Sequence, residues 1–124
     1  MSIITIKLND NFNIHTINNE IKYAFNNNEN VIFIFDIVSL GILNWSLLLS
    51  ILPLLKRYKK EIKLKLVKSI IVAPHKWQHS LLKTFFSLYK PTKPFQLVFN
   101  YQSIKENDIY PLPHIEENYN ELHV

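Results

Sequence analysis

The stretch VIFIFD, residues 31–36, decides the fold of this chain. Its first five residues are all apolar, and the polar residues 26–30 and Asp36 bound them. A short, continuous apolar run between turn-forming residues is typical of a strand that is buried on both faces of a parallel sheet. We therefore expect residues 31–35 to form the central strand of an α/β domain.

Strand and helix patterns alternate on both sides of this run. Apolar residues with helical spacing follow three positions where a helix could begin. Thr16 and Asn44 are candidate N-cap residues for the first two helices, and the third helix follows Pro74, which ends the preceding strand. Ser103 is expected to cap a short last helix. The expected strands are residues 3–8, 31–35, 65–73 and 95–99, and the expected main helices are residues 16–25, 45–58 (with Pro53 inside) and 75–90.

The length of 124 residues suits one domain. We predict a single small α/β domain over residues 1–109, with a mostly parallel sheet of about four strands and three main helices. Right-handed crossovers would lay the helices over the sheet, although nearly all-apolar strands also allow helices on both faces. Residues 110–124 are acidic, have no apolar periodicity, and are expected to form an extended or mobile tail.

The composition excludes several classes of protein. The chain has no cysteine, so it has no disulfides and no thiolate metal site, and a reducing compartment suits it. Residues 1–7 do not resemble a signal peptide, and the apolar stretch 47–55 is too short to cross a bilayer. We expect a cytoplasmic protein without a transmembrane segment.

The order of elements and several local strings resemble two related families, the STAS domains and the CRAL-TRIO domains. The STAS resemblance covers most of residues 3–107 and is carried by residues 14–25, residues 31–37, the helix from Trp45, and residues 95–99 before a short helix. It implies an α/β module that binds other proteins in a regulatory or scaffolding role.

The CRAL-TRIO resemblance rests on a strand, proline, helix and strand segment. Its strand IIVAP, residues 70–74, precedes a helix with Trp77, Leu82 and Phe85, and residues 90–98 follow. It implies a similar fold that binds lipid.

Polar residues follow the central strand, where α/β folds place their ligands. Asp36 stands at its carboxyl end, and Ser39 and the sole glycine, Gly41, follow in the loop. We favour a structural role, in which Asp36 accepts hydrogen bonds from backbone N–H groups of residues 39–41. For Gly41 we favour a turn with positive φ over close approach by a partner.

No catalytic set can be identified. His75 and His79 lie four residues apart, as two zinc ligands on a helix would, but nothing in the sequence completes a site, and we interpret both as surface histidines. One glycine cannot form a phosphate-binding loop, and no serine, histidine and aspartate group has the context of a nucleophile. We expect no enzyme activity, no metal and no cofactor.

Charge is distributed unevenly. Residues 56–93 contain eleven basic residues and one acid, Glu61, for a net charge of +10 against −6 for the rest of the chain. Such segregation can form a positive face that attracts anionic partners, or the bases can simply solvate helix ends and strand edges. The expected binding residues are Lys56, Arg57, Lys59, Lys60 and Lys63.

These patterns favour a non-enzymatic STAS-like module that binds a protein partner. The helix over residues 45–58 is apolar nearly all round, which also suggests a homodimer. The alternative is a peripheral protein that binds anionic lipid through its basic face. Nucleic acid is disfavoured, because the chain has a single arginine.

Overall fold

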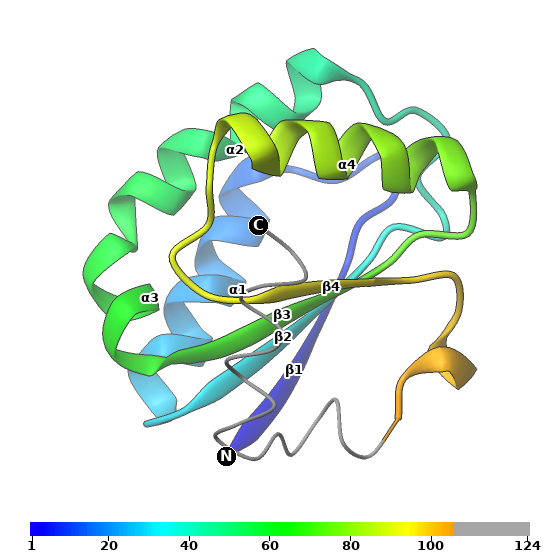
Figure 1. Ribbon diagram of the computed structural model, residues 1–124. Helices are drawn as coiled ribbons and strands as arrows, with labels where there is room; N and C mark the ends of the chain where they lie inside the picture. The colour runs from blue at the N-terminus through cyan, green and yellow to red at the C-terminus, as the bar shows by residue number, and fades with distance from the viewer. Residues whose placement is uncertain (106–124) are drawn as a thin grey trace.

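The computed structural model describes residues 1–105, which form a two-layer α/β domain (Figure 1). Strands and helices alternate, as the sequence predicted. In chain order they are β1 (Ser2–Lys7), α1 (Ile14–Asn27), β2 (Val31–Asp36), α2 (Trp45–Arg57), α3 (Lys59–Lys65), β3 (Leu66–Val72), α4 (Lys76–Leu88), β4 (Phe95–Val98) and the 3₁₀ turn η1 (Tyr101–Ser103).

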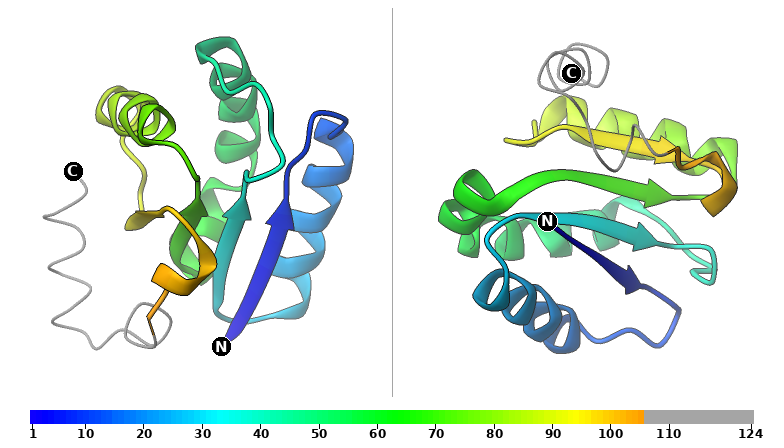
Figure 2. Two further views of the ribbon diagram at one scale, coloured as in Figure 1. Left: turned by 90° about the vertical axis from the view of Figure 1, so that its right-hand side faces the viewer. Right: turned by 90° about the horizontal axis from the view of Figure 1, so that it is seen from below.

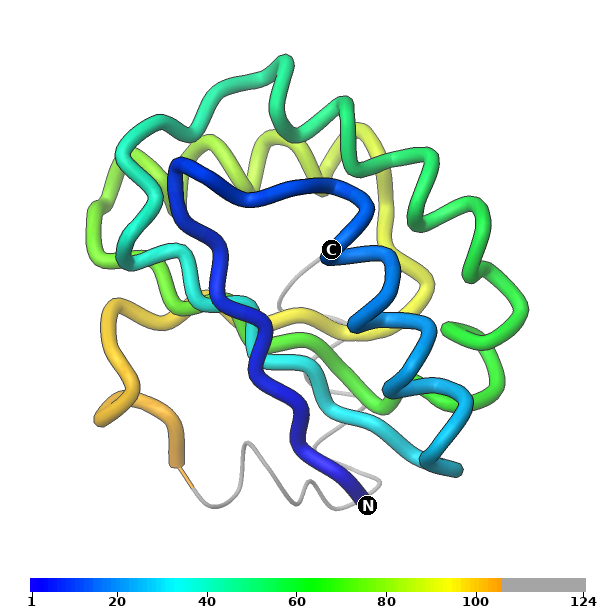
Figure 3. Tube along the Cα trace, turned by 180° about the vertical axis from the view of Figure 1, so that it is seen from behind, coloured from blue at the N-terminus to red at the C-terminus, as the bar shows by residue number. Residues whose placement is uncertain are grey.

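The four strands are all parallel and lie in the order β1-β2-β3-β4. Each helical connection therefore crosses to the next strand in the same direction. Right-handed crossovers that advance in one direction place every helix on the same face of the sheet. The helices lie together on one side of the strands (Figure 2), and the chain winds repeatedly from strand to helix to the adjacent strand (Figure 3). The arrangement with helices on both faces is not present in residues 1–105.

The main hydrophobic core lies between the sheet and the helices. Phe33 of β2 points into it and contacts Phe25 of α1 edge to face, with ring centroids 5.4 Å apart. Tyr58, between α2 and α3, packs on the same Phe25 ring at 6.0 Å. Because Phe25 is 1% exposed and touches both neighbouring elements, it ties α1 and the α2–α3 junction to the central strand.

The opposite side of the sheet is a second apolar surface, which we call the open face. No helix of residues 1–105 covers it (Figure 1). Val67 and Ile104 pack against its buried side chains. Those buried residues are Ile32, Ile34, Ile70, Val72 and Val98.

Some predicted boundaries were wrong. Helix α1 begins earlier than Thr16, because the Asn13 side chain accepts a hydrogen bond from the His15 N–H and caps the helix there. Residues 59–65 form the additional helix α3. The cap of η1 is Asn100 and not Ser103, because the Asn100 side chain accepts a hydrogen bond from the Ser103 N–H.

Helix α2 begins at its predicted cap, where the Asn44 side chain accepts from the Leu47 N–H at 2.9 Å. Its apolar surface is only partly covered, since Leu49 and Leu55 are each 39% exposed. Homodimer formation through this helix stays a prediction. Within residues 1–105, no helix is long and apolar enough to span a membrane. The predicted tail, residues 110–124, lies outside the described residues.

The core contact at Phe25 predicts a large loss of stability on truncation. Phe25→Ala should lower the free energy of unfolding by about 3–5 kcal/mol, because it removes a buried ring and leaves a cavity. Tyr23→Ala is the matched control on the same helix, since Tyr23 is 71% exposed, and it should change stability by about 0.5 kcal/mol or less. Urea unfolding followed by circular dichroism measures both. Similar losses in the two variants would contradict the assigned core.

Candidate functional site

Asp36 is the last residue of β2 and lies at the edge where the strands end. Its side chain is 8% exposed. One carboxylate oxygen, Oδ1, accepts from the Val38 N–H at 2.9 Å, and Oδ2 accepts from the Tyr101 hydroxyl at 2.5 Å. Both oxygens therefore have partners within the chain. The structural interpretation of Asp36 is correct in kind, but the backbone donor is Val38 and not residues 39–41.

Tyr101 reaches Asp36 because η1 follows directly after β4. The Asn100 side chain accepts from both the N–H and the hydroxyl of Ser103, which fixes this turn. Partial burial of the phenol, its hydrogen bond to Asp36 and the charge of that carboxylate raise the pKa of Tyr101 to about 12. Tyr101 is therefore a neutral donor at neutral pH, and its bond to Asp36 clamps η1 to the end of β2.

A shallow, open pocket of about 430 Å³ lies beside this clamp. It holds one ammonium and one carboxylate, and that carboxylate already accepts two hydrogen bonds. The sequence identified Asp36 and Ser39 in this pocket, but no pattern marked Tyr101. Its lining residues are Lys7, Asp36, Val38, Ser39, Pro74, Phe99, Asn100 and Tyr101.

His79 has a structural role. It is 8% exposed, its Nε2–H donates to the Ala73 carbonyl at 2.8 Å, and its ring stacks on Phe99 with centroids 4.1 Å apart. The prediction of a surface histidine was therefore wrong for His79. His75 is exposed and caps α4. No group of three or more metal-ligating side chains forms among residues 1–105.

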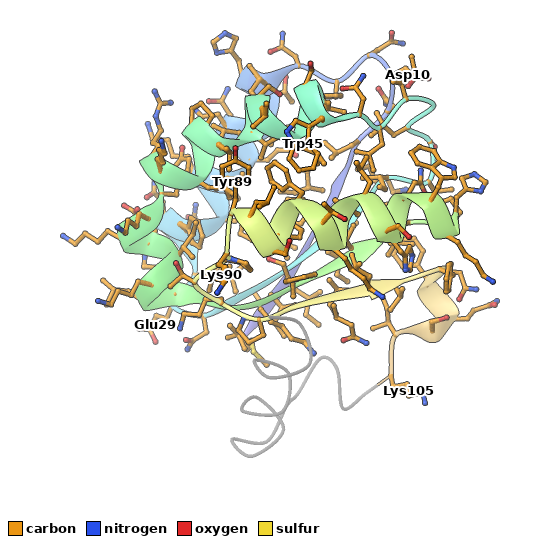
Figure 4. All side chains as sticks on the ribbon, turned by 45° about the horizontal axis from the view of Figure 1, so that its top comes forward. Asp10, Glu29, Trp45, Tyr89, Lys90 and Lys105 are labelled. Atoms are coloured by element: carbon orange, nitrogen blue, oxygen red, sulfur yellow. The ribbon has the colours of Figure 1, made fainter. Side chains whose placement is uncertain are left out.

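Gly41 lies in close contact with the side chain of Asp10. It has no positive φ, so the turn that we favoured is wrong. Its N–H donates to Asp10 Oδ1 at 2.7 Å, and a Cβ at this position would lie 2.9 Å from Asp10 Oδ2. Figure 4 shows Asp10 beside the loop that leads into α2. The group that approaches Gly41 closely thus belongs to this chain.

The predicted cationic residues lie at the opposite edge, where β3 begins. Two of these residues are the last two of α2, and three lie on α3, which leads directly into β3. All five are exposed to solvent. Lys90, at the end of the α4 connection, lies toward the same end of the molecule (Figure 4). We call the five residues the basic edge: Lys56, Arg57, Lys59, Lys60 and Lys63.

Three side-chain hydrogen bonds hold the basic edge in place. The Tyr58 hydroxyl donates to the Asn18 side chain at 2.7 Å, and Arg57 donates to the same Oδ1 at 3.1 Å. Lys65, at the end of α3, donates to the Phe25 carbonyl in the last turns of α1 at 2.5 Å. The junction of α2 and α3 is therefore attached to α1 by side chains and not left as a loose loop.

The eleven bases of residues 56–93 do not form a single positive face. Lys76 and Lys83 stand on α4. Lys68 is 1% exposed and lies on the open face of the sheet, next to Ile32. It is placed there by a bulge at Val67, which shifts the register of β3 against β2 by one residue. The positive charge that the sequence suggested for one face is therefore divided among the basic edge, helix α4 and the open face.

The clamp predicts a shift in tyrosine titration. The titration of the wild type minus that of Tyr101→Phe isolates this phenol, and it should show an ionisation near pH 12. In Asp36→Asn the ionisation should move toward the ordinary value of about 10, because the carboxylate charge is gone. Since the folded-state pKa is raised, the stabilisation by neutral Tyr101 is complete below pH ~10 and is lost as the pH rises toward ~12. Tyrosinate absorbance against pH is the measurement, and a step near pH 10 in the difference between wild type and Tyr101→Phe would disprove the clamp.

Comparisons with protein-family models, with curated proteins and with solved structures gave no match for this chain. The resemblance to STAS and CRAL-TRIO domains therefore rests on the sequence pattern alone.

Proposed function

We propose that this chain is a non-enzymatic, STAS-like interaction module that binds an acidic segment of a protein partner through its basic edge. The observation that carries the proposal is the placement of five exposed cations on the consecutive helices α2 and α3. Glu61 is the one acid on α3. A cluster of one sign attracts anionic partners and raises their encounter rate.

The attachment of this edge supports a binding role. Lys59 and Lys63 are four residues apart on α3, so they are neighbours on the surface of this helix. Tyr58, immediately before them, is 8% exposed and hydrogen-bonded to Asn18. Because the backbone of the junction is fixed, a partner need not order it on binding, and the entropic cost falls on the lysine side chains alone.

A non-enzymatic role is supported by how the polar side chains at the strand ends are used. Asp36 accepts two hydrogen bonds within the chain, and Tyr101 is held as a neutral donor to it. His79 donates to a backbone carbonyl and is stacked. These groups stabilise loops, so within residues 1–105 we assign none of them to acid, base or nucleophile chemistry.

A protein partner suits this edge better than nucleic acid does. Arginine is the residue that pairs with both oxygens of a phosphate, and the chain has a single arginine, Arg57. The STAS-like part of the proposal is supported by the alternation of strands and helices, on which that resemblance rests. A reducing cytoplasmic location belongs to the same proposal, as does self-association through the exposed part of α2.

A specific observation favours one alternative, the CRAL-TRIO-like binding of an anionic membrane surface. Leu64 is 67% exposed on α3 beside Lys63, and Leu55 is 39% exposed at the end of α2. Apolar side chains next to lysines are how peripheral segments insert among lipid headgroups. Under this alternative, Leu64 would enter the bilayer interface while the basic edge contacts the headgroups.

The proposal predicts that binding follows the position of the charges. The edge variant replaces Lys56, Lys59, Lys60 and Lys63 with Gln. The control variant makes the same change of charge at four exposed lysines elsewhere: Lys7, Lys22, Lys76 and Lys83. The probes are a polyglutamate peptide, and vesicles of phosphatidylcholine with and without phosphatidylserine.

Affinity for polyglutamate should fall by about 100-fold or more in the edge variant, since each basic residue near an anionic partner contributes on the order of 1 kcal/mol. The control variant should retain most of the affinity of the wild type. Added salt should weaken the binding of polyglutamate to the wild type. Equal losses in both variants would mean that net charge alone matters and would refute the basic edge. If the protein binds vesicles that contain phosphatidylserine but does not bind polyglutamate, and Leu64→Ser weakens the vesicle binding, the lipid alternative would replace the proposal.

A further inference from the structure

The part of the open face that β2, β3 and β4 form is buried within a single chain, although none of the helices lies on it. On β1, Ile3 lies beside Ile32 on the same face and is 37% exposed. Ile32, Ile70 and Val72 are each 0% exposed, and Ile34 and Val98 are 6% and 5% exposed. Helices α1 to α4 pack against the other side. Val67 and Ile104 are the partly buried residues of the described chain that pack against this cluster.

One polar side chain of β3 and one of β4 lie on this face beside the isoleucines. Lys68 lies opposite Ile32 in the register and is 1% exposed. Anionic and hydrogen-bonding groups stabilise a buried ammonium, so an acidic segment is compatible with this face. Gln96 pairs with Ile70, and its buried Oε1 accepts no hydrogen bond from any residue of the described part of the chain.

We propose that the C-terminal segment, residues 106–124, binds across the open face and completes the core. The described chain arrives there, because Ile104 packs against the buried cluster and Lys105 follows it. Nineteen residues come next. An extended chain rises about 3.3 Å per residue and strands lie about 4.8 Å apart, so this length is ample to cross four strands.

The composition of this segment complements the face. It has five acidic residues and no lysine or arginine, whereas residues 1–105 carry fourteen basic and five acidic residues. Its carboxylates suit a surface that contains Lys68. Ile109, Leu112 and Ile115 suit the isoleucines and valines beside it. Pro111 and Pro113 favour an extended course, as expected for a segment without helical periodicity.

A second copy of the chain fits the face less well. The five apolar residues are already buried in one chain, so they offer almost no area to another molecule. The sequence predicts an extended or mobile tail over residues 110–124, and under this proposal these residues are extended and bound.

Full-length variants test the proposal. The segment variant replaces Ile109, Leu112 and Ile115 with Ser. The control makes the same kind of change at three exposed residues on the helix side: Ile42 (67% exposed), Leu64 (67%) and Leu88 (65%). The segment variant should lose about 1 M or more from its urea midpoint and bind an apolar dye such as ANS more strongly, while the control should change little. Equal midpoints and equal dye binding in the two variants would overturn the proposal.

The charges provide a second readout. A chain in which the five acids of the segment become amides should lose stability, and combining these changes with Lys68→Met should recover most of that loss, because no buried cation then remains to be paired. Additive effects of the two sets of changes would contradict a charged contact between the segment and the face. Light scattering on the full chain tests whether a second copy covers the face instead. If the wild type is a dimer and the segment variant is a monomer, the face binds a second copy.

Discussion

All four strands run parallel and follow one another across the sheet in chain order, and the other features of the molecule depend on this constraint. The connections all advance in the same direction, and right-handed crossovers that do so place their helices on one face. The loops after the strands meet at one edge, where Asp36 and Tyr101 clamp η1 to β2. The helix ends and α3 meet at the other edge, which is the basic one. The remaining face of the sheet has no helix among residues 1–105.

Much of this arrangement could be predicted from the sequence. The continuous apolar run at residues 31–35 identified the central strand, and Asn44 marked the start of α2, because both signals are local. The run also required cover on both faces. It could not show what provides that cover, since side-chain alternation does not distinguish a helix from an extended segment.

The errors have physical causes of their own. Lys68 counted as a surface cation until the bulge at Val67 turned it onto the open face, and a shift of register by one residue leaves no trace in composition. His79 looked like a surface residue because the helical pattern does not show that Phe99, twenty positions later, stacks on it. Gly41 gave no sign that Asp10 is its neighbour, since that contact joins two loops that are distant in sequence. Candidate site residues were thus easier to identify than the contacts that determine their roles.

The central claim is that the open face is covered by the chain's own C-terminal segment, and the most direct test is a proximity measurement in solution. Nuclear Overhauser effects from the methyl groups of Ile32, Ile34 and Ile70, in full-length protein with labelled isoleucine methyls, report on neighbours within about the distance of packed side chains. If residues 106–124 bind across the open face, these methyl groups should show contacts to ring protons of Tyr110 or Tyr119. Methyl groups that show contacts to Val67, Val72 and Ile104 but none to residues 106–124 would contradict it.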